Sequence, residues 1–501
     1  MKKKIIYTCL TGLLLMAGLG SCELKSEMYD AINPTIYPTT ARDARDLVTA
    51  NVYGVFRNSS YDGIFNVATG IILTSDMASD YGWCSWDDNG TWSRCYFAAY
   101  TPNDTRNVTH GWDFINNISK MTLTIERVQG IEMNEDLKNQ YIAELRCGRG
   151  FLAFLIYDLF GPLIVADLET LKNPLNEKIL PRLSDEDTRA YIVTELTEAA
   201  KSLPYNYKKG DADYGRFTKG LCHMVLLKFY MQTKQWDKAI AEGRELMKPE
   251  YGYELVPVYK NIFTEANEKN LETIWAVNCL EGYQIHLWYP HVLPNNYAPF
   301  KNQGWGGYKM TWDFFKTFED GDQRKETILY EYETSQGEFL NEENKGSGGN
   351  SLAQGVFPLK YALEQNVADH CQTDWIVYRY ADALTLLAEA IVRAGNVVTP
   401  EAVDLLNRVR TRAGLPAYTV NDFAGDRDFL DKLLLERGHE FFFEGSRRQD
   451  LIRDGSYIEK MNAKCVAFGQ KPLVTEKHIL FPLKESAINE GKGIVKQNPE
   501  Y

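Results

Sequence analysis

Two helical hairpins limit the folds that this 501-residue chain can adopt. Residues 216–230 and 236–247 carry apolar side chains at helical spacing, with a short turn at residues 232–235 between them. Residues 376–394 and 400–413 form a second pair of the same kind. Because each helix of a hairpin buries its apolar side against its partner, the sequence favours a fold built from packed helical pairs.

The first hairpin resembles a tetratricopeptide repeat. Tyr230 lies near the end of its first helix, and the small residue Ala239 lies where the second helix must touch the first. Residues 143–158 and 185–203 are two further predicted helices, ended by glycine or proline. Two clear pairs are too few for a regular array. We therefore predict an all-α, tetratricopeptide-like helical-hairpin scaffold with long irregular loops and minor β-hairpins.

The amino terminus is typical of an exported lipoprotein. Three lysines at positions 2–4 precede an apolar stretch at residues 5–18, which is too short to span a bilayer. The sequence LGSC that ends at Cys22 resembles the bacterial lipobox, whose cysteine is acylated and begins the mature chain. This predicts a signal peptide at residues 1–21, a mature region at residues 22–501 and a lipid anchor at Cys22. The alternatives are an uncleaved signal anchor and ordinary secretion.

The charge of the chain argues against a nucleic acid partner. The formal net charge is −13, and it becomes −16 once the three lysines of the signal peptide are removed. No block of lysine and arginine offers the basic patch that displaces phosphate counterions. No later segment has 18 consecutive apolar residues, so we expect no further membrane segment.

The sequence contains none of the motifs that mark common active sites, such as GxSxG, HExxH, a Walker loop or GxGxxG after a strand. His286 and His291 are the only histidines near each other, and we expect polar loop residues rather than metal ligands. Asp76 and Asp80 could form a glycosidase pair, but 68 acidic residues make such spacing common. We therefore expect no enzyme activity, no metal and no cofactor.

Tryptophan is concentrated in two segments outside the predicted hairpins, which we take as loop insertions around residues 76–111 and 281–311. Flat aromatic faces stack on the apolar faces of sugar rings, while neighbouring amide and charged groups bond the hydroxyls. These segments therefore have the composition of a glycan site. The competing interpretation is that the rings pack long loops onto the core, and Trp112 and Trp312 fit that interpretation better.

The first aromatic segment is predicted to be a β-hairpin. Asn89-Gly90 between two short runs favours a type I′ turn, and counting back from it places Cys84 opposite Cys95. Directly opposed residues of antiparallel strands lie within disulfide range. A disulfide between these two cysteines and an open pair are both compatible with the sequence.

Strand alternation in this hairpin places Trp83, Trp92 and Tyr96 on one face. We predict that these three rings form a ligand platform, with Trp86 on the opposite face beside the cysteines. A helix at this position, or burial of the rings, would contradict the platform.

Proline and glycine keep the second aromatic segment out of regular structure, and its amides can bond sugar hydroxyls. The ligand contacts predicted here are Trp288, Asn296, Tyr297, Trp305 and Tyr308. We also predict that the two aromatic segments converge.

Four blocks in the carboxyl-terminal part resemble the SusD/RagB family. They are RYAD with the following AEA at residues 379–390, NRVRTRAGL at 407–415, the charged block at 436–451, and FPL through QNPEY at 481–501. Arg448, Glu490 and Glu500 stand where that family commonly has tryptophan, proline and glycine.

The resemblance implies an outer-membrane, lipid-anchored protein, facing the cell exterior, that binds oligosaccharide or polysaccharide on inserted loops. It also implies a SusC-like TonB-dependent transporter as partner, to which the glycan is passed for import. A peptide-binding lid of a RagAB-type importer is the alternative, and a glycoside hydrolase is the less favoured one.

The charged residues of these blocks are predicted to be structural. Glu436, Glu440 and Glu444 fall four residues apart on one helical face, with arginines nearby as partners. Buried ion pairs of this sort fix the register of packed helices. Arg379 and Asp382 could pair with each other or with neighbouring backbone.

Overall fold

The structure is a computed structural model, and the part of the chain that it describes excludes the predicted signal peptide and Cys22. The described residues are 37–59, 62–104, 108–173, 175–176, 178–363 and 370–501. Among them, no helix combines the length and the apolar character needed to cross a membrane.

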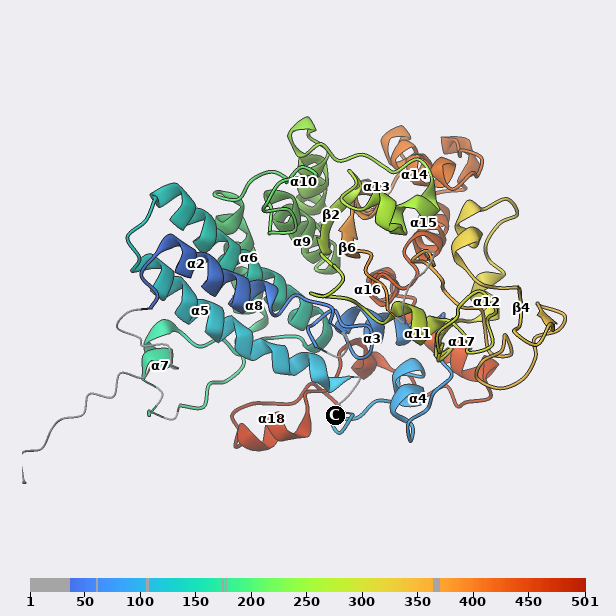
Figure 1. The fold of residues 1–501 in the computed structure, drawn as a ribbon, viewed down its shortest axis with the longest axis horizontal. Coiled ribbons are helices and arrows are strands. Elements are labelled where there is room, and N and C mark those ends of the chain that lie inside the picture. Colours follow the sequence, from blue (N-terminus) through green and yellow to red (C-terminus); the bar gives the residue numbers. More distant parts are fainter. Residues whose placement is uncertain (1–36, 60–61, 105–107, 174, 177, 364–369) are drawn as a thin grey trace, which may run out of the picture.

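A series of packed helices forms the scaffold (Figure 1). Its members are α2 (Ala41–Val48), α5 (Asn116–Gln129), α6 (Glu135–Phe160), α8 (Asp185–Ala200), α9 (Lys219–Gln232), α10 (Trp236–Leu246), α13 (Tyr380–Gly395), α14 (Pro400–Arg412) and α15 (Asp426–Glu440). Each of α6, α8, α9, α10, α13 and α14 packs on the helix before it in this order. The hairpins α9–α10 and α13–α14 confirm the predicted all-α, tetratricopeptide-like scaffold.

Shorter helices and strands belong to the loop-rich part of the molecule. The helices are α3 (Ile71–Met77), α4 (Thr91–Tyr96), α7 (Leu168–Lys172), α11 (Trp288–Val292), α12 (Trp312–Phe315), α16 (Arg447–Asp454), α17 (Tyr457–Ala467) and α18 (Glu485–Glu490). The strands are β1 (Gly82–Cys84), β2 (Thr273–Val277), β3 (Tyr308–Met310), β4 (Tyr332–Glu333), β5 (Phe339–Leu340) and β6 (Trp375–Arg379). They form three two-stranded antiparallel sheets, β1–β3, β2–β6 and β4–β5.

Side-chain caps begin several of the scaffold helices, among them α6, α8, α9 and α14. Asn134, Ser184, Thr218 and Thr399 each accept a hydrogen bond from the backbone N–H three residues later. Such caps satisfy donors that the first helical turn leaves free, and each contributes about 1 kcal/mol. Thr218 explains why α9 begins at Lys219 rather than at the predicted residue 216.

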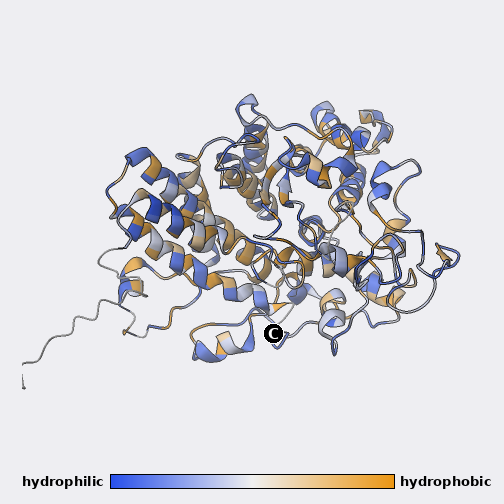
Figure 2. Cartoon of the chain, viewed as in Figure 1, coloured by the Kyte–Doolittle hydropathy of each residue, from blue (hydrophilic) through white to orange (hydrophobic). Residues whose placement is uncertain are grey.

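Small residues allow the helices to approach closely. Ala239 is buried in α10, and a Cβ on Gly243 would lie 2.9 Å from Cβ of Leu387 in α13. The exposed sides are polar, and Figure 2 shows both hydrophilic and hydrophobic colour along α5. Its buried residues Ile118, Met121 and Val128 recur at helical spacing, because α5 buries one side only.

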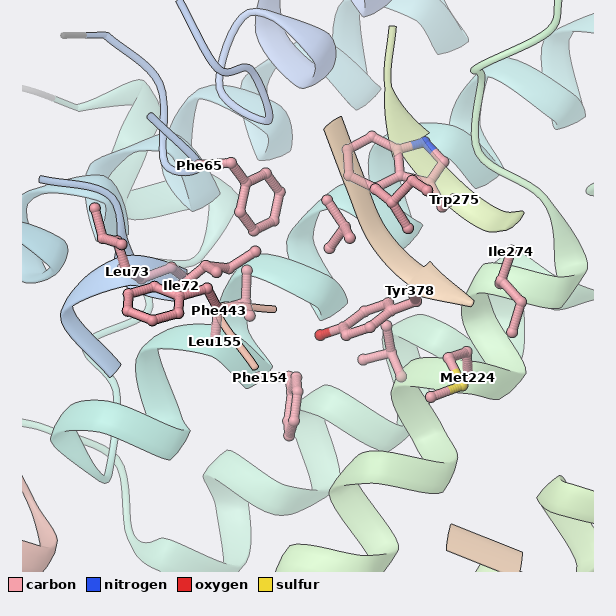
Figure 3. Close-up of a cluster of buried hydrophobic side chains, with 14 of the residues drawn as sticks. Phe65, Ile72, Leu73, Phe154, Leu155, Met224, Ile274, Trp275, Tyr378 and Phe443 are labelled. Atoms are coloured by element: carbon pink, nitrogen blue, oxygen red, sulfur yellow. The ribbon is translucent and has the colours of Figure 1, made fainter. Parts of the chain in front are cut away.

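The core continues from the scaffold into the loop-rich part. Figure 3 shows Phe154 and Leu155 of α6 near Tyr378 of β6. Phe65 lies above them in this view, as does Trp275, which belongs to β2. The ring centroids of Phe65 and Trp275 lie 5.9 Å apart. The buried cluster extends to Val495, so both parts share one hydrophobic core.

Three predictions of local structure are wrong, and one of them is that the second aromatic segment stays out of regular structure, since α11 and β3 lie in it. Residues 376–379, predicted to begin a helix, belong to β6, because Ile376 and its β-branched or aromatic neighbours pair with β2 and are buried. The predicted β-hairpin at residues 83–96 does not form. β1 pairs instead with β3, more than 200 residues later, and residues 91–96 are the helix α4.

The carboxyl-terminal charges form a buried network, but its partners differ from the predicted ones. Arg379 pairs with Glu272 and with Glu440 and Glu444, and not with Asp382. Asp382 pairs with Arg437 and Lys228. Glu444 lies beyond the end of α15, so only Glu436 and Glu440 share the predicted helical face.

Candidate ligand-binding site

The two aromatic segments meet where β1 pairs with β3. Trp83 lies opposite Lys309 in the register, and the backbone N–H of Ser85 donates to the carbonyl of Gly307 at 2.8 Å. The pairing brings residues 82–96 beside residues 288–310, and α4 and α11 flank it (Figure 1). We call the rings that meet here, Trp86, His291, Trp305 and Tyr308, the aromatic junction.

Trp86 is at the centre of the aromatic junction. Its ring centroid lies 6.2 Å from that of Trp305, 5.5 Å from His291 and 5.4 Å from Tyr308. The indole N–H of Trp86 donates to the carbonyl of Trp305 at 3.1 Å. Trp86 and Trp305 are half-buried, whereas His291 and Tyr308 are buried beneath them. The junction therefore presents two fixed indole rings to the solvent.

The absence of a side chain at Gly307 creates the space for Trp86. A Cβ at this position would lie 2.3 Å from the indole ring. The backbone of Trp305 is held as well, because its N–H donates to the carbonyl of Pro290 at 2.7 Å. Both indoles are thus positioned before any ligand arrives.

Exposed polar residues lie on the same two segments as the indoles. Asn295, Asn302 and Gln303 are exposed on the same loop as Trp305, and Asp87 and Asn89 are exposed beside Trp86. Half-buried rings with amides around them can stack on a sugar ring and bond its hydroxyls.

Asn296 and Tyr297 are half-buried and contact the β4 strand. The Tyr332 hydroxyl donates to Oδ1 of Asn296 at 3.1 Å, and the rings of Tyr297 and Tyr332 are perpendicular at 5.7 Å. Together with Trp305, these two residues are the predicted contacts whose side chains reach the solvent on this loop.

The predicted platform of Trp83, Trp92 and Tyr96 is wrong, because it depended on strand alternation. Trp92 and Tyr96 lie in α4 and are buried, with Trp92 2% exposed. Trp83 is half-buried and stacks on Phe468 at 4.3 Å, away from the aromatic junction. Trp86, which the hairpin register placed on the wrong face, is the ring that meets Trp305.

Trp288 and Tyr308 are also buried, at 1% and 0% exposure. Trp288 packs against Trp375 and Phe443, and the Tyr308 hydroxyl donates to the carbonyl of Val67 at 2.7 Å. Both residues are buried beneath the surface and are not available to a ligand. Of the predicted contacts, Trp305, Asn296 and Tyr297 are half-buried on this loop, and Trp83 is half-buried away from it.

Cys84 and Cys95 are free and buried in this structure. The register that would have placed them opposite each other is absent, since Cys84 lies opposite Tyr308 and Cys95 lies in α4. Burial raises the pKa of the Cys95 thiol to about 12, so it stays protonated at neutral pH.

Buried titratable groups near the aromatic junction support its loops. Burial lowers the pKa of Lys309 to about 7, and its ammonium group donates to the carbonyl of Ser351 at 2.6 Å. His286, expected to be a polar loop residue, is fully buried, and burial lowers its pKa to about 3. His291 is buried too, so neither histidine lies on a loop surface.

The acidic pair considered for a glycosidase is bound within the fold. Asp76 accepts hydrogen bonds from the backbone N–H groups of Gly445 and Arg447, at 2.6 and 3.3 Å, and burial raises its pKa to about 7. Asp80 forms an ion pair with Arg447 at 2.8 Å. Both carboxylates connect α3 to the start of α16.

The fold and its loop-borne indoles define a tetratricopeptide-like scaffold with a surface aromatic site. Residues 271–501 match the model of the SusD family, the family that the sequence motifs resemble. A SusD-like protein of Formosa agariphila is 24% identical over 437 residues, which are 74% of this chain and 76% of that protein.

Solved structures share the fold. Surface glycan-binding protein A from Bacteroides thetaiotaomicron, in complex with laminarihexaose, is 20% identical, with a TM-score of 0.74 over 92% of this chain and 100% of that one. A SusD homolog from the same organism is also 20% identical, with a TM-score of 0.76 over 93% and 98%.

Proposed function

We propose that this protein is a cell-surface lipoprotein that captures an oligosaccharide or polysaccharide at the aromatic junction. The observation that carries the proposal is the pair of half-buried indoles, Trp86 and Trp305, whose ring centroids lie 6.2 Å apart on segments that also carry exposed amides. The laminarihexaose bound to a structural relative supports a glycan as the ligand. Capture requires no bond cleavage: stacking holds the apolar sugar faces, and the amides bond the hydroxyls.

The proposal includes a lipid anchor at Cys22 and delivery of the glycan to a SusC-like TonB-dependent transporter in the outer membrane. A lipid with two or more acyl chains holds a protein stably at a membrane. The anchor would keep the binding surface beside its transporter. Cys22→Ala should leave glycan binding intact and move the protein to the soluble fraction, and a membrane-retained variant would refute the anchor.

Calorimetry with laminarihexaose and a panel of other glycans tests the site. Trp86→Ala and Trp305→Ala should each lower the affinity by at least about tenfold for whichever glycan the wild-type protein binds. The reason is that truncating a central tryptophan commonly costs about 2 kcal/mol or more. Trp236→Ala is the matched control, since this half-buried tryptophan lies on α10 of the scaffold.

Unchanged binding in both site variants would refute the assignment of the aromatic junction. Binding of a peptide pool in place of any glycan would favour the RagAB-type alternative. Release of reducing ends from a polysaccharide would instead indicate a glycoside hydrolase.

A further inference from the structure

A cleft of about 730 Å³ lies between residues 93–101, at the end of α4, and residues 465–478, which follow α17. The Tyr100 hydroxyl donates to the carbonyl of His478 at 2.6 Å and fastens one wall to the other. The Cys465 thiol lies 3.7 Å from the carbonyl oxygen of Phe97 and makes a second link. Small-molecule sites commonly have volumes of about 300 to 1,000 Å³, so the cleft is large enough for an oligosaccharide segment.

The charged side chains that line this cleft are all positive. They are Arg94, Lys471 and Lys477, and among the described residues no aspartate or glutamate lines it. Arg94 is neutralised by Asp104, with Nε 2.6 Å from Oδ1. Within the described ranges no carboxylate forms an ion pair with Lys471 or Lys477. Burial lowers the pKa of His478, so its ring is neutral at pH 7.

A second cleft provides a comparison. It has a volume of about 480 Å³ and is lined by Arg45 and Arg216, among others. There Arg45 pairs with Asp213 at 2.7 Å, and Arg216 pairs with Glu144 at 2.8 Å. Its cations are therefore balanced within the fold, whereas the two lysines of the larger cleft leave positive charge on a chain whose net charge is −13.

An aromatic ring forms part of the larger cleft. Phe97 is half-buried, and its ring lies 5.8 Å from Trp83 and 6.3 Å from Phe468, which fix it from behind. Phe97 lines the same cleft as the two lysines, and the Lys477 ammonium lies 5.2 Å from the centroid of the Tyr501 ring. A cleft that combines an aromatic ring with ammonium groups suits a ligand that has both an apolar face and negative charge. Sugars with carboxylate or sulfate groups have this combination, and ammonium groups form strong hydrogen bonds to such anions.

We propose that this cleft is a second binding site, separate from the aromatic junction, for the anionic groups of an acidic saccharide. That the ligand is a saccharide depends on the proposed function, whereas its charge depends on the cleft alone. Lys471 and Lys477 bind the anion and Phe97 stacks on the sugar ring.

The test measures binding of trigalacturonate, of a sulfated galactose trisaccharide and of neutral laminarihexaose by calorimetry at two salt concentrations. The variant Lys471→Gln with Lys477→Gln should weaken binding of the anionic probe by at least about tenfold, since a tenfold loss corresponds to about 1.4 kcal/mol. It should also reduce the salt dependence, because two fewer charges are screened. Laminarihexaose binding should not change.

The control variant is Lys208→Gln with Lys209→Gln, which removes the same charge from an exposed turn elsewhere. The proposal is supported if binding of either anionic probe is lost in the cleft variant and kept in the control variant. The two probes distinguish a carboxylate ligand from a sulfated ligand. An equal loss in both variants, or no binding of either anion by the wild type, overturns it. Failure of the proposed function would appear separately, as laminarihexaose binding that Trp86→Ala and Trp305→Ala leave unchanged.

Discussion

The side chain of Arg379 forms ion pairs with glutamates from distant segments, which the sequence around it does not indicate. Its guanidinium group contacts Oε1 of Glu272 at 2.8 Å, Oε2 of Glu444 at 2.7 Å and the backbone carbonyl of Glu440 at 2.8 Å. Arg324 and Arg412 add ion pairs to Glu440 within the same buried cluster. All of these groups are removed from water, so each depends on its partners to remain charged.

Arg379→Ala should lower the free energy of unfolding by about 3 to 5 kcal/mol, because it leaves buried glutamates without a partner. Urea denaturation followed by circular dichroism measures the change. The matched control is Lys260→Ala, which breaks an exposed pair with Glu326 and should cost less than about 1 kcal/mol. Equal costs for the two variants would contradict a structural role for the network.

At the scale of elements, the segment around Asn89 shows how a turn signal can mislead. Asp88, Asn89 and Gly90 all have positive φ, at 46°, 59° and 86°. A type I′ hairpin also requires positive φ, so the local residues fit the predicted turn. The chain then enters α4, since β3 already occupies the partner position beside β1.

Gly307 tests whether the β1–β3 junction orients the indole of Trp86. Gly307→Ala adds a Cβ that would lie 2.3 Å from this ring, so Trp86 must move. We expect weaker binding of laminarihexaose or whichever glycan binds, with a smaller loss than for Trp86→Ala. Gly349→Ala is the control on a neighbouring loop, because its Cβ would meet Ser85 at an ordinary 3.4 Å. Unchanged affinity in Gly307→Ala would mean that the position of Trp86 does not matter.

At the scale of the whole molecule, the charge network joins the scaffold to the loop-rich part. Its members come from residues near β2, from residues 322–324, from β6, and from α14 and α15. The hydrophobic core is continuous across the same boundary. We therefore expect the two parts to unfold together.

Acid should reveal this coupling. Burial alone would raise the pKa of Glu440, but Arg412 and Arg379 lower it from 4.5 to about 2. Arg437 and Arg453 likewise hold the pKa of Asp450 below its usual range, against the effect of burial. The unfolded chain therefore binds these protons at a higher pH than the folded protein does. The free energy of unfolding should fall as the pH drops from about 4.5 towards 2.

Urea unfolding at several pH values in this window, followed by tryptophan fluorescence and by far-ultraviolet circular dichroism, checks the prediction. Tryptophan reports mainly on the loop-rich part and circular dichroism on the helices, so coincident transitions indicate one cooperative unit. Glu440→Gln should flatten the pH dependence. Separate transitions, or stability that does not fall with acid, would refute the coupling.

The sequence by itself determined the helical hairpins and the composition of the binding loops. Helical spacing and caps such as Thr218 and Thr399 act within a few residues of one another, so local sequence encodes them. The family blocks at the carboxyl terminus were equally readable. The concentration of tryptophan and amides in two loops also indicated where a ligand site would form.

Only the tertiary structure decided which rings reach the solvent. The side of the chain on which Trp86 lies depends on the pairing of β1 with β3, which ends at Tyr308. The partners of Arg379 come from segments more than 60 residues away on both sides. β-pairing and buried ion pairs join residues that are distant in sequence, and shifting a strand register by one residue reverses every side chain. For this reason the sequence located the aromatic segments, and the fold selected Trp86 and Trp305 from them.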